Sequence, residues 1–121
     1  MARFLVVLQP AERLDPQALI QDLDPLVRRL EAQVEHRTAC HLSALLRDGS
    51  DNLRLQLFAD VQAKAVGQVL ELVLMSREPM GRGAPLTRER FQRLVQMTGE
   101  SLPGLRVIFR SDRDGPLPDH G

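Results

Sequence analysis

The chain has 121 residues, of which 43% are hydrophobic, and its 16 basic and 16 acidic side chains give a formal net charge of +0. This length suits one domain with its own core, and the hydrophobic content excludes a disordered chain. No apolar run approaches the roughly 20 residues that a membrane-spanning helix needs, so we expect no membrane partner.

The N-terminal segment predicts a strand. Phe4–Leu8 is a continuous apolar run of strand length, which is typical of a strand covered on both faces of its sheet. Pro10 ends this run. We therefore expect a central strand over Arg3–Gln9.

The next segment predicts a helical region. Asp15 followed by Pro16 is a helix start, and apolar residues then recur at spacings of three and four to about Glu35. Pro25 lies inside this stretch and removes a helical hydrogen bond. We expect either a kink or two short helices, with Asp24 capping the second.

The middle of the chain predicts a hairpin of antiparallel strands. The first strand, His36–Arg47, alternates so that one set of residues faces the core: Thr38, Cys40, Leu42, Ala44 and Leu46. Asp48–Asp51 is a turn-forming cluster. The second strand, Asn52–Ala59, has one apolar and one mixed face.

Residues 61–75 are open to two interpretations. One face of a helical wheel collects Val61, Ala65, Val69, Leu72 and Val73, and Asp60 can cap such a helix. The rival is a strand over Val69–Met75, which is short, apolar and partly β-branched. We favour the helix.

The C-terminal third predicts a loop, a helix, a strand and a tail. Arg77–Pro85 is rich in Gly and Pro, which predicts a loop, and Thr87 can cap a helix that ends at Gly99. The last strand is Leu105–Arg110. We expect a single domain over residues 1–110 and a flexible C-terminal tail over residues 111–121.

Together these elements predict an α+β fold with an antiparallel sheet. The order β-α-β-β-α-α-β corresponds to the ferredoxin-like βαββαβ sandwich with an extra helix before the last helix. In that plan both connections lie on one face of the sheet. The opposite face would be open unless a partner covers it.

The predicted strands carry six arginines and no acidic residue, which would separate a basic sheet from an acidic remainder. The open face would then carry charged and polar groups among the apolar residues Leu5, Val7, Leu45, Phe58 and Ile108. We take as a candidate interface or anion-binding site seven residues: Arg37, His41, Arg47, Arg54, Phe58, Arg106 and Arg110.

Such a mixed face favours a homo-oligomer in which arginines surround an apolar centre. The alternative is binding of an anion, a nucleic acid or an acidic protein, since guanidinium groups bind phosphate and carboxylate. The face offers only Phe58 for stacking on bases, and the chain has no Trp or Tyr. We therefore expect a binding and assembly domain.

An enzymatic function is the second alternative, in which His41 or His36 would be the proton carrier. A metal site is disfavoured because His36 and Cys40 would share one side of a strand while His41 points away. We assign no catalytic residue, no metal ligand and no cofactor. Cys40 is the single cysteine and Phe4–Leu8 is too short for a signal-peptide core, so we expect a cytoplasmic protein.

In layout, the stretch from Leu45 to Val73 resembles the hairpin-then-helix portion of small dimeric α/β-barrel proteins, including the antibiotic-biosynthesis monooxygenase type. The resemblance covers about a quarter of the chain and rests on the order of the elements. Few aromatic residues lie near the hairpin, and the expected helix has no His. The resemblance therefore implies no active-site residue here.

Overall fold

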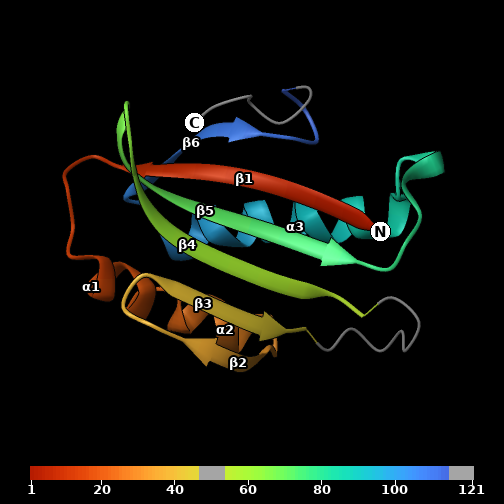
Figure 1. Cartoon of the computed structure of the whole chain (residues 1–121), viewed down its shortest axis with the longest axis horizontal. Coiled ribbons are helices and arrows are strands. Elements are labelled where there is room, and N and C mark those ends of the chain that lie inside the picture. Colours follow the sequence, from red (N-terminus) through yellow and green to blue (C-terminus); the bar gives the residue numbers. More distant parts are fainter. Residues whose placement is uncertain (47–53, 115–121) are drawn as a thin grey trace.

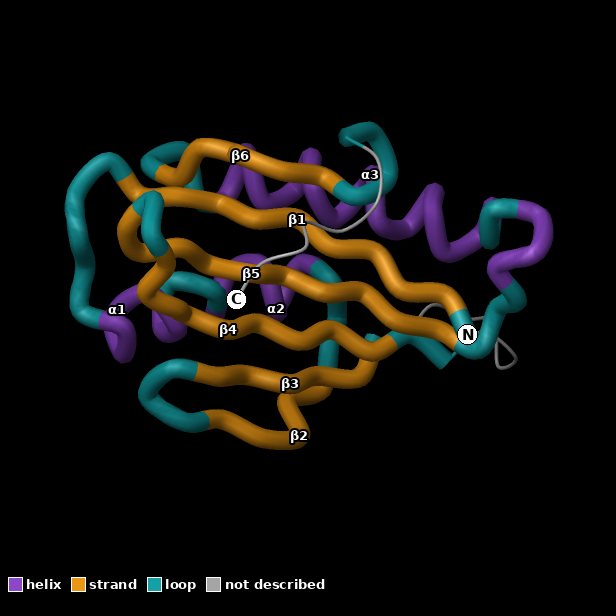
Figure 2. Tube along the Cα trace, turned by 45° about the horizontal axis from the view of Figure 1, so that its top comes forward, coloured by secondary structure: helices purple, strands orange, loops and turns teal. Residues whose placement is uncertain are grey.

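The computed structural model describes residues 1–46 and 54–114, which form one antiparallel sheet with helices on one side (Figure 1). The elements, in chain order, are β1 (Ala2–Pro10), α1 (Pro16–Gln21), α2 (Asp24–Arg29), β2 (Gln33–Arg37), β3 (His41–Leu45), β4 (Gln56–Lys64), β5 (Gly67–Ser76), the 3-10 turn η1 (Met80–Arg82), α3 (Pro85–Ser101) and β6 (Leu105–Arg110). The strand order is β2-β3-β4-β5-β1-β6. Figure 2 shows α1, α2 and α3 behind the sheet, and we call the opposite side the helix-free face.

The α+β class and the antiparallel sheet are confirmed, but the ferredoxin-like plan with an extra helix is not. The described residues form six strands in place of four. The β2–β3 hairpin lies at the edge of the sheet, next to β4. The predicted extra helix is absent from the described part of the chain because its residues are strands.

The helix predicted over residues 61–75 is wrong, and the rival strand is the element that forms. β4 continues to Lys64, a two-residue turn follows, and β5 returns from Gly67. Gly67 has φ +113°, which favours glycine at the start of β5. The run Val69–Met75 is apolar because β5 packs on both faces, which also explains why it could imitate a helical stripe. With a strand here, the hairpin-then-helix layout is not present.

The predicted strand His36–Arg47 is two strands. β2 already begins at Gln33, and the chain turns at residues 38–40 before β3. Leu42 and Ala44 are buried as expected, whereas Cys40 is exposed in the turn. The prediction that the next strand is its antiparallel neighbour is confirmed by the β3–β4 pairing. The predicted turn over Asp48–Asp51 lies outside the described residues.

The N-terminal helical region consists of two short helices, as one of the two expectations stated. Asp15 Oδ1 accepts a hydrogen bond from Gln17 N at 3.4 Å. The break before α2 has Leu23 at its N-cap, so Asp24 is the first helical residue and not the cap. The helical stretch ends at α2 rather than at Glu35, because Glu31 adopts φ +53° and turns the chain into β2.

The last helix begins three residues earlier than predicted, because Ala84 and not Thr87 is at its N-cap position. Ala84 occupies the N-cap in a left-handed conformation and makes no side-chain bond. The Glu78 carboxylate supplies the missing cap. Leu86 N donates to Glu78 Oε2 at 3.1 Å, and Thr87 N donates to Glu78 Oε1 at 2.7 Å. A residue outside the helix therefore satisfies its first amide groups.

Glu78, Thr87 and Ser76 form a closed ring of hydrogen bonds. Thr87 Oγ1 donates to Glu78 Oε1 at 2.7 Å, so Ser76 Oγ must donate to Thr87 Oγ1, while Ser76 Oγ accepts from Glu78 N at 3.0 Å. Burial acts to raise the pKa of the Glu78 carboxyl. The hydrogen bonds from Thr87 and Leu86 outweigh this effect and hold its pKa below the ordinary value of 4.5.

The main core lies between the sheet and the helices. Phe4 and Phe91 stack there with ring centroids 5.3 Å apart, among the buried Leu and Ile side chains of α1, α2, β4 and β5. β1 is an interior strand between β5 and β6 and packs on both faces, as its apolar run predicted, but it lies next to the edge strand β6 and not at the centre of the sheet. No helix in the described part of the chain is long and apolar enough to cross a membrane.

The division into a domain and a tail stays a prediction. Residues 111–114 form a turn in which Ser111 N donates to Leu5 O at 2.9 Å, and Leu5 N donates to Ser111 Oγ at 2.9 Å. The rest of the predicted tail lies outside the described residues.

Candidate functional site

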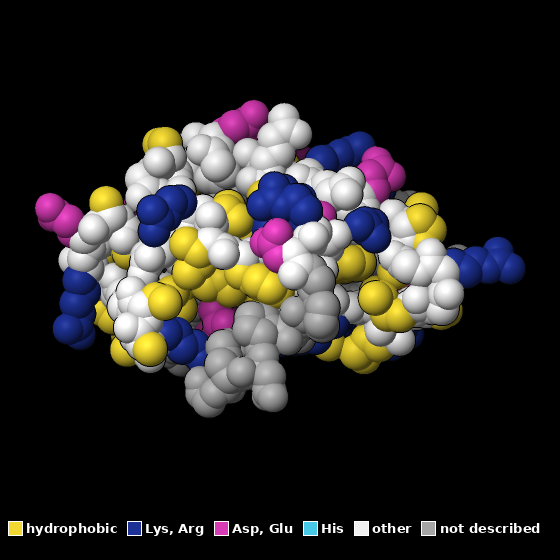
Figure 3. Space-filling view, turned by 90° about the horizontal axis from the view of Figure 1, so that it is seen from above, with side chains coloured by type: hydrophobic (Ala, Val, Ile, Leu, Met, Phe, Trp, Pro, Cys, Tyr) yellow, Lys and Arg dark blue, Asp and Glu magenta, His cyan; other side chains and the backbone are white. Residues whose placement is uncertain are grey.

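A second apolar cluster lies on the helix-free face. The strand register aligns Leu5 with Val73 and Val73 with Phe58. The face cluster, as we call it, comprises seven residues in all: Leu5, Val7, Val69 and Val73, with Phe58, Met75 and Phe109 packed against them. A view from above the orientation of Figure 1 shows hydrophobic side chains gathered in the middle of the surface, with Lys and Arg side chains around them (Figure 3).

The face cluster has a buried centre and a partly exposed border. Its four aliphatic side chains are at most 9% exposed, whereas Phe58, Met75 and Phe109 keep part of their surface accessible. Three members of the cluster, Val69, Val73 and Met75, were not expected here, because the predicted helix included them. The period-two alternation that continues through Ala63 is the signal that could have revealed the strand pair.

Polar groups adjoin the face cluster at β3 and β4. His41 Nδ1 lies 2.7 Å from Asp60 Oδ1, and this pair is partly exposed. The His41 ring lies 6.5 Å from that of Phe58 and 5.8 Å from that of His36, measured between centroids. If Nδ1 donates to the Asp60 carboxylate, Nε2 of His41 is left as an acceptor.

The structure brings only part of the predicted site together. His41 and Phe58 lie on the helix-free face, and Arg106 does too, because it is paired in register with Gln9. Arg54 lies just before β4 with φ +47°, beside Gln56 at the end of this face. Arg47 lies outside the described residues.

Arg37 is on the opposite side from its predicted position. It pairs in register with the buried Leu42, and its Nη2 lies 2.7 Å from Asp24 Oδ1 at the start of α2. A register shift between Val34 and His36 changes the phase of β2. Arg37 therefore joins β2 to the helical layer.

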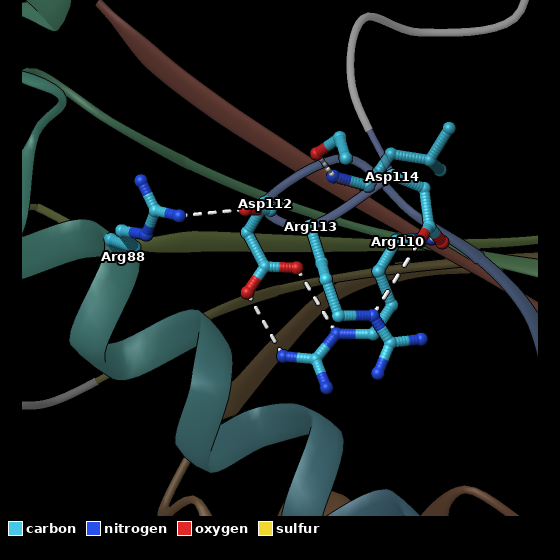
Figure 4. A network of polar contacts seen from close by, with 7 residues as sticks. Arg88, Arg110, Asp112, Arg113 and Asp114 are labelled. Atoms are coloured by element: carbon cyan, nitrogen blue, oxygen red, sulfur yellow. Dashed lines mark hydrogen bonds and ion pairs between the residues drawn. The ribbon is translucent and has the colours of Figure 1, made fainter.

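Arg110 also faces the helical layer, because a bulge at Ile108 shifts the phase of β6 and places Phe109 on the helix-free face instead. Its guanidinium donates to both carboxylate oxygens of Asp112, at 3.0 and 2.9 Å, and the Asp112 side chain is only 3% exposed (Figure 4). Arg88 of α3 donates to the Asp112 carbonyl oxygen at 2.6 Å. Arg110 is thus part of a structural network.

The expectation of a sheet without acidic residues is wrong. Glu35, Asp60 and Glu71 lie on β2, β4 and β5. Asp60 and Glu71 are direct cross-strand partners, and Glu71 is in turn opposite Val7 of the face cluster. The helix-free face therefore carries both signs of charge.

The histidines are arranged differently from the prediction. His36 and His41 lie with their rings adjacent, because the chain turns between β2 and β3, and Cys40 sits in that turn. Within residues 1–46 and 54–114, no group of three or more His, Cys, Asp or Glu side chains is arranged to hold a metal ion.

We consider three of the cavities that the described residues form, and neither His36 nor His41 lines any of these three. The largest of these three has a volume of about 870 Å³ and lies where β1 ends, β4 turns into β5 and β6 begins. Cys40 lines it, together with Arg13, Lys64 and Arg106.

Comparison of the chain with protein families, with curated proteins and with solved structures gives no match.

Proposed function

We propose that this chain is a binding and assembly domain that forms a homodimer through the helix-free face. The face cluster carries this proposal. An antiparallel sheet with helices on one side usually exposes polar residues on the other. Here that side has seven clustered apolar residues, three of which remain partly exposed.

The dimensions of the face suit an interface. β1, β4 and β5 have nine or ten residues and extend about 30 Å, whereas β2, β3 and β6 have five or six residues and extend about 18 Å, and each strand takes up about 4.8 Å of width. The projected area is roughly 700 Å², close to the ~800 Å² that each partner contributes to a standard interface. In a twofold dimer the same patch serves both copies.

The charges on the face favour a second copy over a polyanion. Arg3 and Arg106 lie toward opposite ends of β1, with Asp60 and Glu71 in the row between them. A second copy can oppose its arginines to these carboxylates, whereas a nucleic acid would meet repulsion from both. An acidic protein would be repelled in the same way.

Light scattering after size exclusion tests the dimer. We expect the mass of two chains for the wild type and of one chain for Phe58→Glu and Met75→Glu, which place a charge at the border of the face cluster. Met80→Glu is the matched control, because Met80 is 46% exposed but lies outside the cluster. A monomeric wild type at millimolar concentration would refute the proposal.

The His41–Asp60 pair favours a second candidate, proton transfer by His41. The carboxylate would orient the ring so that Nε2 accepts a proton from a substrate, as in other His–carboxylate pairs. p-Nitrophenyl acetate is a general probe of imidazole catalysis. Hydrolysis that is lost in His41→Gln and kept in His36→Gln would support this candidate, and equal rates in both variants would contradict it.

A further inference from the structure

The cavity of about 870 Å³ at the end of β1 concentrates positive charge. Its basic lining residues come from three parts of the chain: Arg13 from the β1–α1 loop, Lys64 from the end of β4 and Arg106 from β6. No Asp or Glu is among its lining residues. In a chain with a formal net charge of +0, this is a local excess of three cations.

These cations are not committed to structural ion pairs. Among the described residues, neither Arg13 nor Lys64 has a hydrogen-bond or ion-pair partner, and the single contact of Arg106 is a long bond of 3.4 Å to Gln9 Oε1. By contrast, Arg37 and Arg110 have carboxylate partners at 2.7 and 2.9 Å. Three unpaired cations around one cavity repel one another unless an anion lies between them.

Hydrogen bonds hold the walls of the cavity in place. The Gln68 side chain accepts from Leu14 N at 2.8 Å and donates to Leu14 O at 2.7 Å, which ties the loop of Arg13 to β5. Gln9 Nε2 donates to Val66 O at 2.7 Å, which ties the β4–β5 turn to β1. The cationic side chains therefore project from segments fixed to one another.

We propose that this cavity binds a small organic anion, either a phosphate monoester or a carboxylate, with an apolar body. The cations would hold the anionic group through charge-assisted hydrogen bonds. Proline and aliphatic side chains supply apolar wall: Pro10, Ala11, Pro16, Val61, Ala63, Val66, Pro103 and Leu105. The volume of 870 Å³ lies within the usual range for ligand sites. This function goes beyond assembly and uses no residue of the face cluster; it shares with the charged border of the proposed interface only Arg106, which lies opposite Gln9 at the end of the helix-free face.

Calorimetric titration with three probes of similar shape tests the site. Phenyl phosphate and phenylacetate carry the two anionic groups, and benzyl alcohol is the neutral analogue. We expect saturable binding of at least one anion, weaker binding at high salt, and no binding of benzyl alcohol. The tighter of the two anions identifies the group that the site prefers. Equal binding of the alcohol would overturn the proposal. So would the absence of binding of either anion up to about 10 mM, which is tenfold above the ~1 mM upper end of typical Michaelis constants.

Charge-removing variants locate the site. Arg13→Gln, Lys64→Gln and Arg106→Gln should each weaken anion binding by about tenfold, the loss expected for one charge-assisted bond. Arg28→Gln is the matched control, because Arg28 is an exposed arginine of α2 that lines none of the three cavities. Affinity unchanged in all three cavity variants would overturn the assignment.

The single cysteine provides an independent readout. Cys40 is exposed and lines the cavity, so a bound anion should slow its alkylation by iodoacetamide, measured by mass spectrometry. Protection should be reduced in the three cavity variants and retained in Arg28→Gln. The same protection in Phe58→Glu would separate this site from the dimer interface, and alkylation unaffected by a saturating anion would contradict binding in this cavity.

Discussion

The ring of Glu78, Thr87 and Ser76 should stabilise the fold measurably. Thr87→Val keeps the shape of a fully buried side chain but removes the hydroxyl that donates to Glu78 and accepts from Ser76. A hydrogen bond to a charged group contributes about 1.5–3 kcal/mol, so the variant should lose about 2 kcal/mol of unfolding free energy. For a chain of this size that corresponds to a fall in Tm of roughly 8 °C. Urea denaturation followed by circular dichroism measures it.

The pH dependence provides the second half of this test. The pKa of Glu78 is lower in the folded chain than its ordinary value of 4.5, so the ionised carboxylate stabilises the fold above about pH 4.5. That contribution is lost as the pH falls through the folded-state pKa. Glu78→Gln should therefore be less stable than the wild type at pH 7, with a smaller difference at pH 3. A difference that is the same at both pH values, or a Thr87→Val loss below about 0.5 kcal/mol, would refute this account of the ring.

Two further variants test the fold. Gly67→Ala should lower the free energy of unfolding by about 1–2 kcal/mol, because Gly67 has a φ of +113°. Gly99→Ala should raise it by about 0.5–1 kcal/mol, because Gly99 lies within α3 and its added Cβ would meet nothing within 4 Å. Denaturant midpoints that shift in the same direction for both variants would contradict the backbone strain at Gly67. Asp112→Asn should lower the free energy of unfolding by about 2 kcal/mol, because Arg110 is then left partly buried without its charge partner. Glu89→Gln removes one partner of an exposed ion pair and should change the free energy of unfolding by less than about 0.5 kcal/mol. Thermal denaturation compares the two variants, and equal losses would refute the structural role of the Arg110–Asp112 pair.

Much of the sheet could be predicted because its signals are local. The apolar run of β1 and the alternation of β3 and β4 reflect burial on two faces and on one face, respectively. The prediction of a helix over residues 61–75 failed for a physical reason. β5 is apolar on both faces, so its sequence has no strict alternation, and two-sided burial can satisfy a helical period equally well.

The candidate site was predicted less well, because side-chain direction depends on features that the sequence does not reveal. One bulge residue reverses the facing of all that follow in a strand. The irregularities in β2 and β6 moved Arg37 and Arg110 to the helical side and placed Phe109 on the helix-free face. One cavity is lined by Arg13, Lys64 and Arg106 because the strand order brings these distant residues together. The strand order could not be predicted from the sequence, so neither could this cavity.

Intermolecular nuclear Overhauser effects test the homodimer most directly. A sample mixed from isotope-labelled and unlabelled chains reports contacts between copies only. The dimer predicts effects between the Phe58 and Phe109 rings of one copy and the Val73 and Met75 methyl groups of the other. No intermolecular effect at millimolar concentration, or effects confined to exposed helix residues such as Leu86, would contradict assembly through the helix-free face.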